Sequence, residues 1–147
     1  LFNLEYFRRV QRIEILDEPL YQYFNCISSS LTNTYNPRLF EDQQRIFNAI
    51  RIFLEEQNLY AKNAAMIETM YIDRVIGCFR NLFLPDCPLP YKEKIHHIHK
   101  MIQSQDAQKA IQVYERKGLK ATVNKLLIRR KLAFFIGLVF HMEAKNA

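Results

Sequence analysis

A run of small polar side chains between residues 25 and 36 is the part of this sequence best suited to hydrogen-bond a ligand. It reads NCISSSLTNTYN, and hydroxyl and amide groups dominate it. These groups both donate and accept hydrogen bonds. Such a run forms either an ordinary surface connection or a loop held over a bound molecule, and the residue types alone leave both readings open.

Acidic side chains that could bind a divalent metal or act as a base occur as three neighbouring pairs, Asp17-Glu18, Glu41-Asp42 and Glu55-Glu56. The sequence contains no Asp-x-Asp. The first pair fits a solvated turn. The second falls in the first turn of an expected helix, where acids interact favourably with the helix dipole. Local structure therefore explains these pairs better than catalysis does.

The segment KIHHIHK, residues 94–100, places His96 and His99 on one face of an expected helix. Two ligands on one turn do not make a metal site without an acid or cysteine from elsewhere, so we expect no metal here. The cysteines, Cys26, Cys78 and Cys87, form no CxxC pair and are odd in number, which favours a reducing compartment.

The elements that must position these groups are mostly helices. Residues 1–10 are helix-like from the first residue, which suggests that the chain is a piece of a longer polypeptide. Residues 12–16 and 20–24 alternate apolar and polar side chains as strands do. We therefore expect residues 1–24 to form a short helix-strand-strand remnant of an α/β domain, followed by the polar loop of residues 25–36.

From residue 37 onward the sequence predicts a mainly α, bundle-like domain. Asn36-Pro37 is a strong helix start, with Asn as the cap and Pro at the first position. Apolar periodicity and the breaks between segments predict helices over 37–57, 61–83, 91–104, 106–117 and 119–145. Asp106 is the expected cap of the fourth helix, and Gly118 its expected end.

The last of these helices carries the positive charge of the protein. Eight of the 21 Lys and Arg residues and only two of the 15 acids follow residue 114. Leu119, Val123, Leu126 and Leu127 share one face, and residues 132–142 are apolar all round except for one histidine. That run is about 16 Å long as a helix, whereas a bilayer core needs about 30 Å. It is therefore too short to cross a membrane.

A basic segment followed by an aromatic, apolar one can lie in a membrane interface. It can equally pack on its own domain or on a second copy, and the sequence leaves this open. The residues predicted to contact a membrane or partner are Lys125, Arg129, Arg130, Lys131, Phe134, Phe135 and Phe140. Because the charge is confined to this tail, we do not expect nucleic-acid binding.

The first 40 residues resemble a known family. The ordered set LFNLEYFRRV, DEPLYQY and SSSLTNTYNPR is similar to the segment that follows the catalytic centre of bacterial family-2 glycosyltransferases, the inverting enzymes of surface-glycan synthesis. The resemblance implies that residues 1–36 are the C-terminal edge of a GT-A type catalytic domain. It implies that residues 37–147 are a helical C-terminal domain.

The resemblance also implies a mechanism whose catalytic groups lie elsewhere. The parent enzyme would bind a nucleotide-sugar with Mg²⁺ or Mn²⁺ on an Asp-x-Asp, and its base would lie just upstream of Leu1. This chain alone would then be inactive. The polar loop would pass the active-site mouth and contact diphosphate or sugar groups. The implied substrate-binding residues are Tyr21, Tyr23, Asn25, Ser29, Ser30, Thr32 and Asn33.

The expected function is thus sugar transfer to a glycan, lipid-linked or protein acceptor. This segment would help to close the acceptor side, at the cytoplasmic face of the cell membrane. The alternative is a non-enzymatic helical module that dimerises or binds a partner through residues 119–145.

Overall fold

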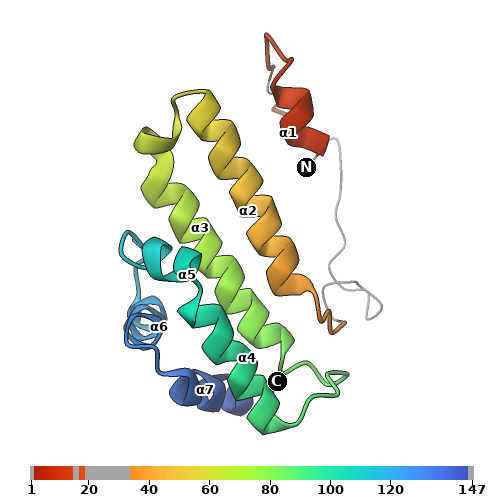
Figure 1. Ribbon diagram of the computed structural model, residues 1–147, viewed down its shortest axis with the longest axis vertical. Helices are drawn as coiled ribbons and strands as arrows, with labels where there is room; N and C mark the ends of the chain where they lie inside the picture. The colour runs from red at the N-terminus through yellow and green to blue at the C-terminus, as the bar shows by residue number, and fades with distance from the viewer. Residues whose placement is uncertain (1, 15–16, 19–33, 146–147) are drawn as a thin grey trace.

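The computed structural model describes residues 2–14, 17–18 and 34–145, and over these residues the chain is mainly helical (Figure 1). The described helices are α1 (Phe2–Phe7), α2 (Leu39–Glu56), α3 (Tyr60–Asn81), α4 (Tyr91–Gln103), α5 (Gln105–Ala110), α6 (Leu119–Arg129) and α7 (Ala133–Lys145).

The expected strand remnant at the start of the chain is not found, because the described residues contain no strand. Residues 12–14 have no regular structure, and Ile13 is 65% exposed. Alternating side chains form a strand only where another strand completes the hydrogen bonds, and none lies beside this segment among the described residues. The second predicted strand, residues 20–24, lies outside the described residues.

Helices α2 and α3 form an antiparallel hairpin that is the longest feature of the molecule (Figure 1). The turn between them is tight because Asn58 adopts a left-handed conformation, with φ of 56°. The amide of Asn58 donates to the carbonyl of Glu55 at 3.0 Å, and that of Leu59 donates to the carbonyl of Leu54 at 2.8 Å. This pair of bonds is the Schellman motif, which ends a helix sharply.

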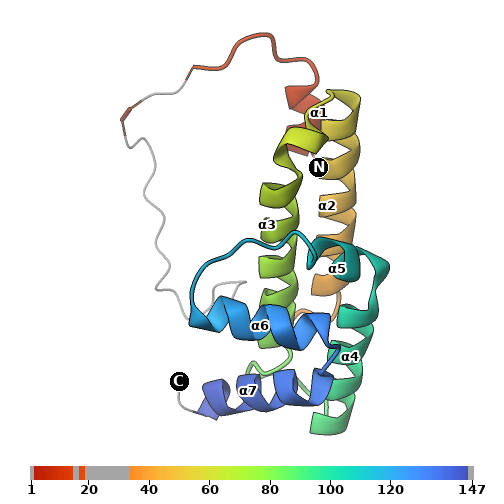
Figure 2. The same ribbon diagram turned by 90° about the vertical axis from the view of Figure 1, so that its left-hand side faces the viewer.

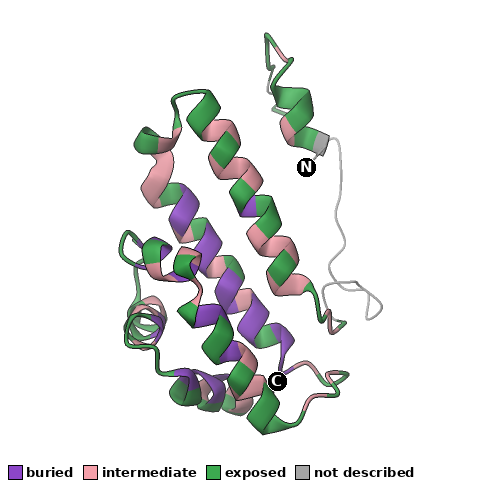
Figure 3. Cartoon of the chain, in the orientation of Figure 1, coloured by how far each residue is buried: buried purple, intermediate pink, exposed green. Residues whose placement is uncertain are grey.

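Helix α3 lies at the centre of the domain, and it has more buried side chains than any other described helix (Figure 3). Val75, Cys78 and Phe79 are buried on its inward face. Helix α2 covers one side of α3, where the rings of Phe47 and Tyr71 lie 5.3 Å apart. Helices α4 and α5 cover another side, and α6 and α7 lie side by side across this layer (Figure 2).

The helix expected over 106–117 is much shorter, because α5 ends at Ala110. Its cap is Ser104 rather than Asp106, since the Ser104 hydroxyl accepts a hydrogen bond from the amide of Ala107 at 3.3 Å. Gly118 does not end this helix. It lies at the start of α6 with φ of 110°, a conformation that favours glycine.

The continuous helix expected over 119–145 is broken into α6 and α7. Lys131 adopts a left-handed conformation, with φ of 56°. The amide of Lys131 donates to the carbonyl of Ile128 at 3.0 Å, and that of Leu132 donates to the carbonyl of Leu127 at 2.9 Å. A second Schellman motif therefore ends α6. It turns the chain so that α7 runs back beside α6 (Figure 2).

Helix α7 approaches α4 closely at Gly137. The end of the Ile95 side chain occupies the place where a Cβ atom on Gly137 would lie. The hydroxyl of Tyr91 is 3.5 Å from the same point. Glycine at this position therefore permits the two helices to pack directly against each other.

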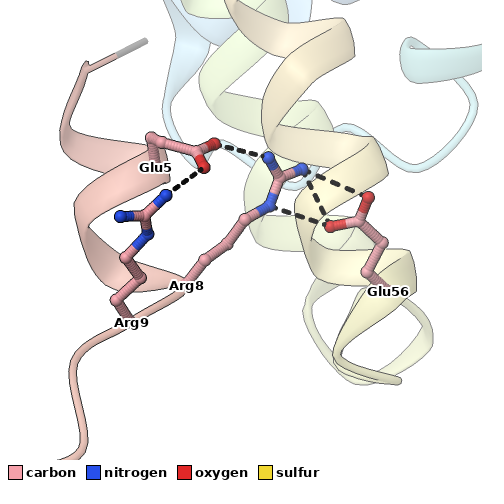
Figure 4. Close-up of polar contacts among 4 residues, drawn as sticks. All are labelled: Glu5, Arg8, Arg9 and Glu56. Atoms are coloured by element: carbon pink, nitrogen blue, oxygen red, sulfur yellow. Dashed lines mark hydrogen bonds and ion pairs between the residues drawn. The ribbon is translucent and has the colours of Figure 1, made fainter.

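Helix α1 is joined to the end of α2 by charged side chains (Figure 4). The Arg8 guanidinium lies 2.9 Å from the carboxylate of Glu56 and 2.7 Å from that of Glu5. The hydrogen bond to Glu5, followed by that to Glu56, raises the pKa of Arg8. These groups are largely exposed, and exposed ion pairs contribute little to stability.

Candidate functional site

The predicted substrate-binding residues lie outside the described residues. This holds for Tyr21, Tyr23, Asn25, Ser29, Ser30, Thr32 and Asn33 alike. The described structure begins again at Thr34, and it shows how the end of the polar run is attached to the helical domain.

Asn36 and Asn81 hold this attachment. The amide nitrogen of the Asn36 backbone donates to Oδ1 of Asn81 at 2.9 Å, and Nδ2 of Asn81 donates to the Asn36 carbonyl at 2.9 Å. The backbone amide of Tyr35 donates to Asp86 at 2.8 Å. Asn81 is 9% exposed, so these bonds are shielded from water. They fix residues 35–36 against the connection between α3 and α4.

The prediction that Asn36 caps this helix, with Pro37 at its first position, is wrong, because α2 begins at Leu39 and its cap residue is Arg38. The side-chain oxygen of Asn36 instead accepts a hydrogen bond from the backbone amide of Arg38 at 2.9 Å. The sequence analysis missed Asn81. The available signal was a polar residue at the end of an otherwise apolar helix face, where a buried amide needs a partner.

The four predicted basic contact residues separate into two groups. Lys125 is partly buried, and its Nζ atom donates to the carbonyl oxygen of Tyr114 at 2.6 Å. It thus helps to hold the connection between α5 and α6. Arg129, Arg130 and Lys131 are exposed at the break between α6 and α7. These three are therefore the ones available to an anionic surface.

The connection that Lys125 supports is also attached to α3. The hydroxyl of Tyr114 donates to Asp73 at 3.1 Å, and Arg116 lies 2.7 Å from the same carboxylate. Burial, followed by the charge of Asp73, raises the pKa of Tyr114 to about 12. Residues 114–116 therefore form a fixed support for α6.

The three predicted aromatic contact residues do not share one surface. Phe134 and Phe135 are 57% and 52% exposed, and their rings lie 5.8 Å apart. Phe140 is only 2% exposed, and its ring lies 5.9 Å from that of Phe79 in the core. The prediction of Phe140 as an outer contact is therefore wrong. It belongs to the inward face of α7 together with Ala133, Ile136 and Gly137.

The outward faces of α6 and α7 are unusually apolar. Of the four apolar residues that the sequence placed on one face of this helix, Leu119, Val123 and Leu126 point outward, whereas Leu127 is partly buried against the core. On α7 the exposed apolar residues follow the spacing of one helix face as well. The exposed large apolar residues of the two helices are Leu119, Val123, Leu126, Phe134, Phe135, Leu138 and Met142.

A groove separates α4 from the start of α7 and has a volume of about 490 Å³. We call it the α4–α7 groove. Its lining residues are Lys92, Ile95, His96, His99, Lys131, Leu132, Ala133, Phe134 and Phe135. We expected no metal at His96 and His99 from the sequence. These two histidines share the groove with two lysines and two phenylalanines.

His99 contacts a neighbouring side chain on its own helix. A ring nitrogen of His99 lies 3.0 Å from Nε2 of Gln103. Over the described part of the chain, no group of three His, Cys, Asp or Glu side chains is placed to hold a metal ion. The chemistry of the groove is instead that of a basic and aromatic surface.

The acidic pairs lie apart from this surface. Glu41 and Asp42 occupy the first turn of α2, as expected, and Glu56 at the other end of α2 pairs with Arg8 (Figure 4). Asp17 and Glu18 are exposed in a bend.

No helix within residues 2–14 and 34–145 combines the length and the apolar composition needed to cross a bilayer.

Comparisons of the chain with protein-family models, with curated proteins and with solved structures found no match.

Proposed function

We propose that this chain is the C-terminal portion of a family-2-like inverting glycosyltransferase, and that its helical domain docks on the anionic inner face of the cell membrane. The parent enzyme would transfer a sugar from a nucleotide-sugar to a glycan, lipid-linked or protein acceptor. The ordered motifs of residues 1–40 support the enzymatic part of this proposal.

One observation carries the docking part. Phe134 and Phe135 are more than half exposed, and only two residues separate them from Arg129, Arg130 and Lys131. Two exposed aromatic rings beside three cations match the composition of a membrane interface, where rings enter the headgroup region and cations meet anionic lipids. Each cation near such a surface contributes about 1 kcal/mol.

Vesicle co-sedimentation tests the docking. We expect the chain to bind vesicles of phosphatidylcholine that contain phosphatidylglycerol, and to bind neutral vesicles much more weakly. Rising salt should weaken binding, because exposed charges are screened beyond about 10 Å at 0.1 M ionic strength. Equal binding to neutral and anionic vesicles would contradict electrostatic docking.

Matched variants locate the surface. The double substitution R129A/R130A should lower binding, whereas R45A/K62A removes the same charge from α2 and α3 and should not. F134S/F135S should lower binding further, and I52S/M66S serves as its control on exposed apolar residues of the other helices. Equal effects of test and control pairs would place the contact elsewhere.

The enzymatic part is tested on the longer polypeptide. We expect the reading frame upstream of Leu1 to encode an Asp-x-Asp and an acidic pair directly before Leu1. In that polypeptide, S30A and N33A should weaken binding of the nucleotide-sugar, with Mg²⁺ or Mn²⁺ present. A start codon beside Leu1 would favour the non-enzymatic alternative.

A second candidate function is dimerisation through α6 and α7. The outward residues Leu119, Val123 and Leu126 favour it, because continuous apolar patches of this kind are commonly covered by a partner. Analytical ultracentrifugation separates the two functions. Association that rises with concentration and is lost in L119S/L126S supports the dimer, and a monomer at high concentration argues against it.

A further inference from the structure

We propose that the α4–α7 groove seats one anionic phospholipid, with the phosphate at its basic rim and the first acyl carbons over its apolar floor. This inference rests on the proposed membrane docking and deepens it. General docking needs only a charged, apolar surface, whereas a seat selects one lipid molecule by shape and charge.

The rim of the groove is basic from both sides. Lys92 and His96 lie one turn apart on α4, and Lys131 faces them from the break before α7. No acidic side chain lines the groove among the residues that the structure describes. Charge-assisted hydrogen bonds from lysine to a phosphate are about twice as strong as neutral ones. The rim therefore complements a single phosphate group.

The floor of the groove is apolar. Ile95 supplies it from α4, and Leu132, Phe134 and Phe135 supply it from α7. A volume of about 490 Å³ is within the range of about 300–1,000 Å³ that is usual for small-molecule sites. An inorganic anion would leave this floor exposed to water, while the glycerol and first acyl carbons of a lipid would cover it.

Two backbone features fix the width of the groove. Gly137 brings α7 against Ile95, so the two helices cannot separate without losing this contact. The left-handed Lys131 ends α6 and places its own side chain at the groove while α7 begins beside it. The first turn of α7 also lies here, and the N-terminal end of a helix favours anions.

A water-soluble short-chain lipid separates this seat from the membrane as a whole. The probe is dihexanoyl-phosphatidylglycerol below its micelle concentration, titrated into the 147-residue chain. The readout is the NMR shift of the Ile95 and Leu132 methyl groups. We expect saturable shifts with this lipid, binding about tenfold weaker with dihexanoyl-phosphatidylcholine, and no saturable shift with inorganic phosphate.

Variants test the named residues. K92A should weaken binding by about tenfold or more, and K131Q should act similarly while keeping a long side chain at the left-handed position. The matched control is K100A, which removes the same charge from α4 but about 12 Å farther along the helix, outside the groove. We expect K100A to change the affinity by less than about twofold.

The outcomes separate this inference from the proposed docking. Vesicle binding without saturable lipid shifts, or equal effects of K92A and K100A, would overturn the seat and leave docking intact. Saturable lipid binding without vesicle binding would support the seat and overturn docking. Equal shifts with inorganic phosphate would identify a simple anion site and overturn the lipid seat.

Discussion

Glu68 accepts two hydrogen bonds from Arg51, and this pair joins α3 to α2 inside the domain. Nε of Arg51 donates to Oε1 at 2.7 Å, and a terminal nitrogen donates to Oε2 at 2.6 Å. The hydroxyl of Tyr60 donates to the same carboxylate at 2.9 Å. The Arg51 guanidinium also lies 4.7 Å from the centre of the Tyr71 ring. Glu68 is 5% exposed, so its charge depends on these partners.

The substitution Glu68→Gln should lower the free energy of unfolding by about 3 kcal/mol, because it leaves the guanidinium of Arg51 partly buried without its charge partner. Denaturation by urea measures the change. The control is Glu55→Gln. Glu55 lines the same surface cavity as Arg51 and Glu68 but is exposed, so its substitution should cost less than about 0.5 kcal/mol. Equal effects of the two substitutions would mean that the buried pair contributes no more to the free energy of unfolding than an exposed carboxylate does.

The substitution Tyr71→Phe should not destabilise the protein at neutral pH, although Tyr71 is fully buried. The Tyr71 hydroxyl lies near Ser104 but makes no hydrogen bond of acceptable geometry with it or with any other described residue. Removing a buried, unpaired hydroxyl should therefore raise the free energy of unfolding by up to about 1 kcal/mol. A loss of more than about 1 kcal/mol would show that the hydroxyl has a partner after all.

The same variant should change the alkaline stability of the protein. Burial, followed by the charge of Asp106, raises the pKa of Tyr71 to about 12 from its ordinary 10. A raised pKa in the folded state gives stability that is complete below pH 10 and is lost between pH 10 and 12. In Tyr71→Phe this loss should shrink by about 2–3 kcal/mol. Urea denaturation of both proteins between pH 10 and pH 12 measures this difference, and equal losses of stability would contradict it.

The substitution Gly137→Ala should destabilise the packing of α7 on α4. The added methyl group meets the end of the Ile95 side chain, so a cost of about 1–3 kcal/mol is expected. Ile95→Val removes the contacting methyl group and costs about 1 kcal/mol alone. Combined with Gly137→Ala it should restore stability. Purely additive losses, measured by thermal unfolding, would contradict this contact.

The substitution Asn81→Ala should lower the free energy of unfolding by about 2 kcal/mol, because it leaves the backbone amide and carbonyl of Asn36 unpaired. The control is Asn63→Ala. The Asn63 side chain donates to the carbonyl of Leu59, four residues earlier, and so does not join distant parts of the chain. Hydrogen exchange of the Asn36 amide gives a local measure. Unchanged protection of that amide in Asn81→Ala would contradict the hydrogen bond between Asn36 and Asn81.

The long helices could be predicted from the sequence because periodicity, caps and prolines agree there. The residues expected to start and end α3 and α4 differ from the observed bounds by at most two positions. The break at Lys131 could not be predicted, since no glycine or proline marks it and the Schellman bonds form only when the following helix packs. The early end of α5 has a similar origin, because Tyr114 bonds to Asp73 rather than continuing the helix.

The surface residues were predicted in part. Arg129, Arg130, Lys131, Phe134 and Phe135 are exposed as a docking surface requires. Phe140 was misplaced because α7 is apolar nearly all round, and a pattern without polar positions does not show which side is inward. From the sequence, His96 and His99 suggest only a metal site, because the sequence does not show that α7 packs against the helix that carries them.

The contact between Gly137 and Ile95 determines which face of α7 packs against α4. Helices usually turn their polar side outward, but α7 has almost no polar side, with Phe134, Phe135, Leu138 and Met142 opposite Ile136 and Phe140. Side-chain size must decide instead, because only the face with Ala133 and Gly137 is small enough to sit on α4. The absence of a side chain at Gly137, on the inward face of α7, therefore determines which residues of α7 face outward.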